Sequence, residues 1–310
     1  LFSEPGNFEE VLTIPFDLRH GECAGDTGYF GRSGGLPLEQ SPDDEKALCF
    51  DSEPLESDIT LLGQVELKAV LLTSSFPSQL ACRICEVTPS GQSNLVTRTV
   101  IALELDNNLE ATRNGNNDDP IMYTIKFPTT AYHFKAGNRI RLALAGSYWP
   151  LVWPNLFQSQ IQIHTQKSML SIPENSDAII SKDALFALPK KLPKKKTCEV
   201  DSQGDLKRGS PVVKDNFVCM GWQQPRVQIT VSDFNLIFSY QTEARYKIIP
   251  GENANAYCQI EHHFDIIRSD GRAKIISSLA VSDDGVVRSW ENEITVSWND
   301  EIMLCKTLKG

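Results

Sequence analysis

The stretch from Ala136 to Pro154, AGNRIRLALAGSYWPLVWP, decides the fold class of this chain. Ile140, Leu142 and Leu144 alternate with residues that point the other way in an extended chain, which predicts a strand with one side in a core. Pro150 and Pro154 then fix φ and remove backbone donors, so helix is disfavoured after the strand. The stretch therefore predicts a β-strand that runs directly into a stiff, apolar loop.

The loop is unusually aromatic, and two interpretations are open. In the first, its tryptophans close the end of a sandwich core, which is the common fate of large aromatic side chains. In the second, they face a partner domain or a substrate, because tryptophan and tyrosine are enriched at interface hot spots. The residues concerned are Tyr148, Trp149, Leu151 and Trp153.

Short alternating segments surround this strand on both sides. They lie at 65–71, 80–87, 95–105, 121–127 and 161–163, and Pro89-Ser90-Gly91 supplies a turn between two of them. No helix long enough for a parallel crossover is indicated. The pattern predicts an all-β protein built as an antiparallel β-sandwich.

The last hundred or so residues alternate again, at 227–231, 236–240, 257–267, 273–281 and 294–298, with a hairpin signal at Asp270-Gly271. These additional C-terminal strands form either a second sheet layer on the sandwich or a small β domain. We expect an irregular lead-in over 1–45 that wraps a surface, the sandwich over 46–180, a linker or surface excursion over 181–215, and the further strands over 216–310.

Composition excludes several classes of function. Hydrophobic residues make up 41% of the 310 residues and the net charge is −10, so a nucleic-acid partner is not expected. The lysine cluster 190–196 has the character of a solvated linker. There is no apolar run of about 18 residues and no signal peptide, so we expect no membrane association. The eight scattered cysteines indicate reduced thiols and a cytoplasmic location.

Three short motifs point to chemistry, each weakly. Ser33 lies in GRSGG, which satisfies G-x-S-x-G but lacks the strand and helix that a nucleophile elbow needs. Cys82 and Cys85 are spaced as C-x-x-C, but no second pair follows and residues three apart in a strand face opposite sides. The polar loop 107–120 could bind calcium or be a plain turn, and its spacing favours the turn. We expect no metal and no cofactor.

Three stretches carry a resemblance to a known family. They are EQSPDDEKALCFDSEPLESDITLLGQVELKAVL (39–71), CRICEVTPSGQSNLVT (82–97) and Ala136–Pro154. In sequence, order and spacing they resemble the C-terminal domain of serine hydrolases of the cocaine esterase and Xaa-Pro dipeptidyl-peptidase (CocE/NonD) family, over roughly residues 17–165. The resemblance implies that the sandwich is a jelly roll of the galactose-binding-like type.

The resemblance also implies a division of labour. In the family, the catalytic serine, aspartate and histidine belong to a separate α/β-hydrolase domain, so no catalytic residue is assigned to this chain. The jelly roll packs on that domain and helps to form the pocket for a small ester, amide or peptide substrate. We assign the contact to Tyr148, Trp149, Leu151 and Trp153, with Asp51 as a further candidate. A homo-oligomer is a further possibility.

The chain departs from the family pattern at one informative position. Many relatives have histidine in a G-H-R-I-R-L run, where this sequence has Asn138. An alternative from another class is a free-standing jelly roll that binds carbohydrate or another ligand, with Trp149 and Trp153 stacking on sugar rings. An independent enzyme that uses Ser33 ranks last.

Overall fold

The computed structural model describes residues 10–25, 36–74, 78–103, 119–153, 159–174, 199–202, 207–208, 212–214, 217–249, 255–284 and 287–310. The chain divides into two compact units. Unit 1 comprises 1–27 and 36–179, and unit 2 comprises 28–35 and 180–310. Within the described ranges almost all regular structure is β-strand paired antiparallel, which confirms the predicted all-β class.

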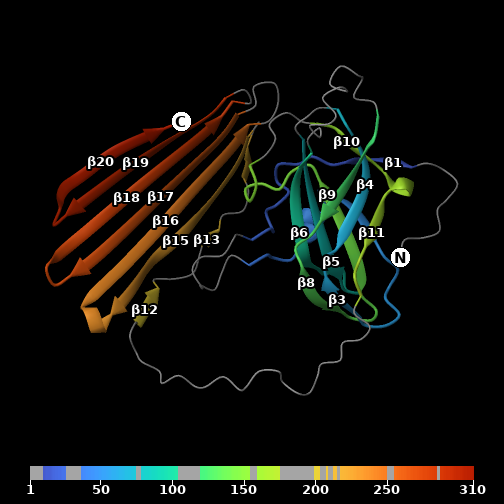
Figure 1. Ribbon diagram of the computed structural model, residues 1–310, viewed down its shortest axis with the longest axis horizontal. Helices are drawn as coiled ribbons and strands as arrows, with labels where there is room; N and C mark the ends of the chain where they lie inside the picture. The colour runs from blue at the N-terminus through green and yellow to red at the C-terminus, as the bar shows by residue number, and fades with distance from the viewer. Residues whose placement is uncertain are drawn as a thin grey trace. The chain divides into compact units, whose positions relative to one another are not determined.

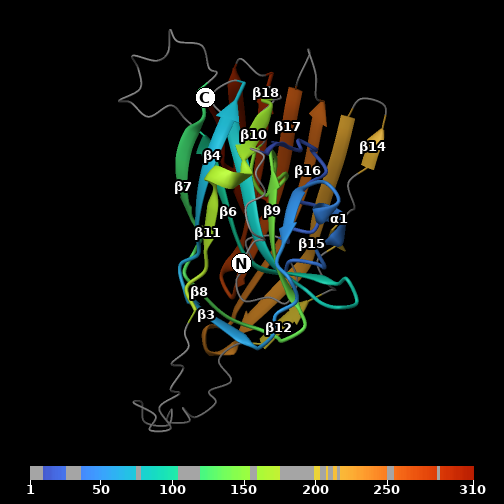
Figure 2. The same cartoon turned by 90° about the vertical axis from the view of Figure 1, so that its right-hand side faces the viewer.

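One layer of unit 1 is a five-stranded sheet in the order β1-β10-β4-β11, with β7 also paired to β4 (Figure 2). Its strands are β1 (Val11–Ile14), β4 (Glu66–Thr73), β7 (Ile121–Lys126), β10 (Ile161–His164) and β11 (Met169–Ser171). The short 3-10 helix η2 (Thr165–Lys167) separates β10 from β11. Both of these strands therefore pair with successive parts of β4.

The other strands of unit 1 form a four-stranded sheet in the order β2-β9-β5-β6 and a two-stranded ribbon of β3 and β8. Their bounds are β2 (Leu48–Asp51), β3 (Ile59–Gly63), β5 (Ser78–Val87), β6 (Ser93–Leu103), β8 (Thr130–Phe134) and β9 (Arg139–Ala145). The stretch Ala136–Pro154 thus supplies β9, which lies between β2 and β5.

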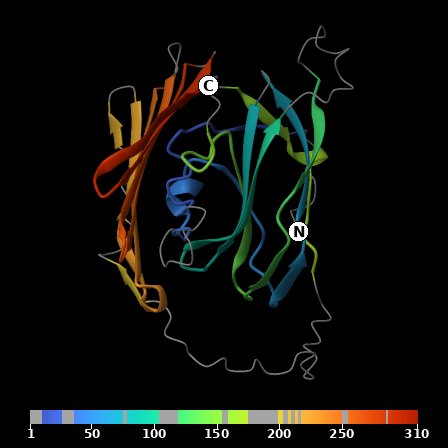
Figure 3. The ribbon, with the colours of Figure 1, turned by 60° about the vertical axis from the view of Figure 1, so that its left-hand side comes forward.

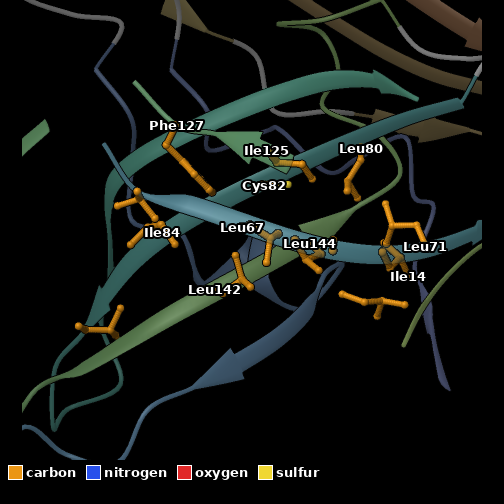
Figure 4. Close-up of a cluster of buried hydrophobic side chains, with 14 of the residues drawn as sticks. Ile14, Leu67, Leu71, Leu80, Cys82, Ile84, Ile125, Phe127, Leu142 and Leu144 are labelled. Carbon is orange, nitrogen blue, oxygen red and sulfur yellow. The ribbon is translucent and has the colours of Figure 1, made fainter. Parts of the chain in front are cut away.

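A large hydrophobic core joins the sheets of unit 1. Leu67 and Leu71 of β4 pack with Leu80 and Ile84 of β5 and with Leu144 of β9 (Figure 4). The inward residues of β9 are the alternating ones that the sequence marked, and Leu144 is fully buried. Unit 1 is therefore a β-sandwich, as predicted.

The beginning of unit 1 is more regular than its composition suggested. Residues Val11–Ile14 form β1, which pairs with β10 because Leu12 and Ile14 alternate toward the core. The short helix α1 (Ser41–Asp44, blue in Figure 3) follows, with Pro42 in its first turn. The expectation of a lead-in without sheet structure was wrong for β1, since four alternating residues were enough to extend an existing sheet edge.

Unit 2 contains a nine-stranded sheet with the order β12-β15-β16-β17-β18-β19-β20, and β13 and β14 also pair with β15 (Figure 1). Long neighbouring strands make most of it: β15 (Phe217–Val231), β16 (Leu236–Ile249), β17 (Asn255–Arg268), β18 (Gly271–Asp283), β19 (Arg288–Trp298) and β20 (Glu301–Lys309). The short ones are β12 (Glu199–Ser202), β13 (Lys207–Arg208) and β14 (Val212–Lys214), and η3 (Ser232–Phe234) precedes β16.

Hairpin turns order this sheet along the chain. Asn299 and Asp300, between β19 and β20, have φ of 49° and 67°, the left-handed values that two-residue hairpin loops require. In the part of the chain that the structure describes, no helix has the length and apolar character needed to cross a bilayer.

Candidate functional site

The aromatic loop after β9 lies largely inside unit 1. Tyr148 is fully buried and Trp149 is 2% exposed, which for these two residues agrees with the first of the two interpretations, closure of the core. Tyr148 packs with Ala24 and Ala81, and Leu151, which is partly buried, packs against this cluster. Trp153 is also partly buried. The assignment of these residues to an interface stays a prediction, and of the four only Leu151 and Trp153 are partly exposed, together with their neighbours Pro150 and Val152.

The segment before α1 explains why the first half of the loop is covered. Gly21 has a φ of +110° and lies so close to the loop that a Cβ there would come within 2.5 Å of the Trp149 carbonyl oxygen. The Trp149 amide donates to the carbonyl of His20 at 3.1 Å. Arg98 Nη1 donates to the Tyr148 hydroxyl at 3.1 Å. Residues 20–24 therefore clamp the loop by backbone contacts that side-chain patterns do not reveal.

His20, the first residue of this clamp, is buried. Its Nδ1 lies 2.6 Å from the carbonyl oxygen of Ser147, so Nδ1 carries the proton and donates. Its Nε2 has no hydrogen-bond partner among the described residues. Burial, with a smaller contribution from the positive charge of Arg83, lowers the pKa of His20 to about 3. His20 is thus a neutral imidazole at physiological pH.

A buried polar network connects α1 to the four-stranded sheet. Arg83 of β5 is 1% exposed and donates from Nη1 to Gln40 Oε1 at 2.9 Å. Its Nη2 lies 2.9 Å from Asp44 Oδ1 as an ion pair. Asp43 accepts from the amides of Gly21 at 3.0 Å and Cys23 at 3.2 Å. Burial nevertheless raises the pKa of Asp43 against the opposing effect of Arg83 and these amides.

Asp44 continues the network to the sheet edge, where Asp51 lies. Arg141 of β9 donates to Asp44 Oδ2 at 2.9 Å and holds Asp51 with two bonds of 2.7 Å each. The bond with Asp51 raises the pKa of Arg141, and burial opposes it. Ser52 is also hydrogen-bonded to β9. Its amide donates to the Ile140 carbonyl, and its hydroxyl accepts from the Ile140 amide. Asp51 and Ser52 therefore hold the C-terminal end of β2 to β9, and the assignment of Asp51 to an interface stays a prediction.

Two further polar groups lie beside β8 and the turn that follows it. Glu86 accepts from the Tyr132 hydroxyl, the Lys135 amide and Asn138 Nδ2 at 2.8, 3.0 and 2.8 Å. On the β3–β8 ribbon, His133 lies 3.0 Å from Thr60 Oγ1 and 2.9 Å from Asp58. This second group is exposed, and Asp58 also accepts from the Ala136 amide, which lowers the pKa of Asp58 to about 2. This exposed group therefore holds the turn after β8 and does not activate the Thr60 hydroxyl.

Glu22, Cys23 and Asp43 have ligand atoms within 4.8 Å of one another, the geometry of a possible metal site. The surroundings do not suit a cation. Lys46 Nζ already lies 2.7 Å from Glu22 Oε1, and Asp43 is engaged by two amides. Burial also raises the pKa of the Cys23 thiol to about 12, so a thiolate ligand is disfavoured.

Several motifs of the sequence lie outside the described residues or take no part in a site. Ser33 and the greater part of the loop 107–120 are outside them. Cys82 and Cys85 are both buried in β5 as free thiols, with a bulge before Cys85. His262 and His263 lie on opposite faces of β17: His262 neighbours Thr242, while His263 contacts Glu261.

A comparison with protein families places most of unit 1 in one of them. Residues 5–198 match the model described as the X-Pro dipeptidyl-peptidase C-terminal non-catalytic domain. The chain belongs to this family. This match confirms the resemblance drawn from 39–71, 82–97 and 136–154, and the family it names is described as non-catalytic.

Solved structures show more distant likenesses. An α-amino acid ester hydrolase has 18% identity over 44% of this chain and 27% of its own, with a TM-score of 0.38. An aminopeptidase from a marine sediment archaeon, Thaumarchaeota archaeon, has 15% identity over 56% of this chain and 34% of its own, with a TM-score of 0.41. A CocE/NonD family hydrolase from Staphylococcus aureus has 14% identity over 44% of this chain and 32% of its own, with a TM-score of 0.32.

This chain thus spans about a quarter to a third of the length of these structures. A search of curated proteins found no match. Sequence reasoning found the family and the strands but missed His20, Asp43 and Arg83. The signal for Arg83 was present in the sequence, because an arginine between buried positions of an apolar strand needs an acidic partner.

Proposed function

We propose that unit 1 packs on the α/β-hydrolase domain of a cytoplasmic serine hydrolase and helps to form its substrate pocket. The family match over 5–198 carries this proposal, because it names a C-terminal domain that has no catalytic role of its own. The parent reaction would be acyl transfer from a small ester, amide or peptide, including dipeptides with proline in second position. The domain contributes pocket walls and excludes water.

The buried clamp suggests how the domain would present the loop. Tyr148 and Trp149 anchor the loop inside unit 1, and Leu151 and Trp153 then supply the partly exposed apolar surface for the partner. An anchored loop loses little conformational entropy on binding, which favours a tight domain contact. Because Trp149 is 2% exposed, stacking of this residue on a sugar ring is disfavoured. An oligomeric parent is compatible with this arrangement.

The first test concerns the location of the nucleophile. An antibody raised against the purified chain should capture the protein that carries it from a native extract, and a fluorophosphonate probe should label a serine outside residues 1–310. The purified chain alone and its Ser33→Ala variant should both remain unlabelled. An adduct on the chain that disappears with Ser33→Ala would make GRSGG the nucleophile site and overturn the proposal.

The second test concerns the loop. In the parent enzyme, Trp153→Ala and Leu151→Ser should raise KM for an X-Pro dipeptide ester or amide more than they change the midpoint of thermal unfolding. Leu62→Ala is the matched control, since Leu62 is an exposed leucine on β3, 53% accessible. Equal effects of all three variants on KM would contradict a role of the loop in the pocket.

A further inference from the structure

Arg98 of β6 lies directly opposite Arg83 of β5, so the two guanidinium groups leave the same face of the four-stranded sheet side by side. Arg83 is 1% exposed, whereas Arg98 is partly exposed. Like charges in opposite positions on neighbouring strands destabilise a sheet. The groups that offset each charge therefore decide what this part of the sheet can bind.

The two arginines have different partners. Arg83 forms an ion pair with Asp44 at 2.9 Å. Arg98 donates from Nη1 to the carbonyl oxygen of Ala24 and to the Tyr148 hydroxyl, the latter at 3.1 Å. Its guanidinium carbon lies 5.4 Å from the centre of the Tyr148 ring. Among the described residues, Nε and Nη2 of Arg98 donate to no group, and no carboxylate pairs with this side chain.

Both partners of Arg98 are neutral. The Ala24 carbonyl carries no charge, and burial raises the pKa of Tyr148, so its hydroxyl keeps its proton at physiological pH. These contacts fix the direction of the side chain but supply no counterion from the described part of the chain. The remaining edge of the guanidinium, formed by Nε and Nη2, has the spacing that binds both oxygens of a carboxylate.

The buried carboxylates of the neighbouring network are already engaged. Asp44 is shared by two arginines, each at 2.9 Å. Asp43 accepts from two backbone amides, at 3.0 and 3.2 Å. Neither carboxylate can turn to Arg98 without leaving one of these buried donors unpaired, which is unfavourable. A counterion for Arg98 therefore has to come from outside this network.

Arg98 also lies beside the loop that we propose as a domain contact. Tyr148 binds Arg98 through its hydroxyl and belongs to the cluster against which Leu151 packs. A domain that covers Leu151 would also remove water from Arg98. Because a guanidinium that loses water without gaining a carboxylate is strongly destabilising, a stable contact at this place requires an acidic group on the partner.

We propose that Arg98 forms an ion pair with a carboxylate of the α/β-hydrolase domain, at the edge of the contact made by Leu151 and Trp153. This inference rests on the function proposed above and names the chemistry of the partner surface. Arginine suits the role, since its planar fork binds a carboxylate in one orientation and is well tolerated at interfaces. An apolar contact alone leaves the orientation of two domains loosely defined, and the ion pair fixes it.

The test uses the parent enzyme without substrate. Arg98→Lys places a primary amine at this position, and a water-soluble carbodiimide activates carboxylates. An activated carboxylate in contact with the amine forms an amide, and the carbodiimide leaves as its urea, so the coupled product has lost one water. Digestion and mass spectrometry should find a peptide that joins position 98 to an aspartate or glutamate outside residues 1–310.

Arg139→Lys is the matched control for the coupling. Arg139 Nη1 lies 3.8 Å from Glu53 Oε2, so the amine introduced there should couple within unit 1. A second measurement exchanges the charges. Arg98→Glu should raise KM for an X-Pro dipeptide amide about tenfold, because it sets two carboxylates against each other. Replacing the coupled carboxylate by lysine in that variant should recover most of the loss, which a merely structural role of Arg98 would not allow.

The outcomes separate this inference from the proposed function. The ion pair is overturned if position 98 couples only within residues 1–310, or not at all, while the Arg139→Lys control couples. It is also overturned if exchanging the charges recovers none of the loss in KM. In both cases the proposed function stands as long as Trp153→Ala and Leu151→Ser still raise KM. If these two variants also leave KM unchanged, the domain contact itself is wrong.

Discussion

Asn138 Nδ2 donates to Glu86 Oε1 at 2.8 Å, which joins the turn before β9 to the end of β5. Glu86 is 7% exposed and accepts two other hydrogen bonds, from Tyr132 and the Lys135 amide. Burial raises the pKa of Glu86, but these three donors outweigh it and the net shift is downward. Asn138 thus supplies an uncharged hydrogen-bond donor to this carboxylate.

The first prediction concerns this pair. Asn138→Ala should lower the free energy of unfolding by about 1–2 kcal/mol, because a buried carboxylate loses a donor. The isosteric Asn138→Asp should cost more at pH 7, since it places two carboxylates in contact, and the deficit should shrink below pH 4.5, the ordinary pKa of Glu86. Urea denaturation at both pH values measures this. Equal costs for the two variants at pH 7 would contradict the contact.

A second prediction concerns the buried network. Arg83→Met should destabilise unit 1 by about 3–5 kcal/mol, because Asp43 would remain buried without a cation and Asp44 would keep only Arg141. Arg139→Met is the control, as Arg139 lies 3.8 Å from Glu53, whose side chain is 93% exposed. Pairs of that kind contribute less than about 1 kcal/mol. Similar urea midpoints for the two variants would show that the network does not hold α1 to the sheet.

The sequence predicted most strands of unit 1 because alternation is a local property. Val65–Leu71 and Leu80–Val87 were visible as period-two runs, and they became β4 and β5. The clamp was not visible, since it depends on backbone approach: Gly21 against Trp149 is a contact over more than a hundred residues. Composition likewise could not show that Tyr148 and Trp149 are covered, because an exposed and a buried aromatic loop have the same residues.

A third prediction follows from His20. Its pKa of about 3 in the folded chain lies below the ordinary 6.5. Between these two pH values, the unfolded chain therefore binds a proton at His20 that the folded chain does not. Stability should therefore fall as pH drops below 6.5, by up to about 1.4 kcal/mol per pH unit from this group. His20→Gln is expected to be less stable at pH 7 but to lose less between pH 6.5 and 5. Parallel pH profiles for both proteins would exclude His20 as the cause.

The last prediction separates steric contact from backbone strain at two glycines. Gly21→Ala should destabilise unit 1 by more than about 3 kcal/mol, because its φ of +110° is unfavourable for alanine and the new Cβ would lie 2.5 Å from the Trp149 carbonyl oxygen. Gly91 has a φ of +87° with nothing within 4 Å of its Cβ position, so Gly91→Ala should cost only about 1–2 kcal/mol.

Urea denaturation followed by tryptophan fluorescence checks the difference, because Trp149 and Trp153 of unit 1 contribute to the signal of the five tryptophans. A Gly21→Ala chain that unfolds at the same urea concentration as Gly91→Ala would mean that the segment 20–24 can move away from the loop at little cost. The loop would then be free to rearrange in the domain contact that we propose. A large difference would instead mean that the loop reaches its partner already fixed, with Leu151 and Trp153 as its accessible part.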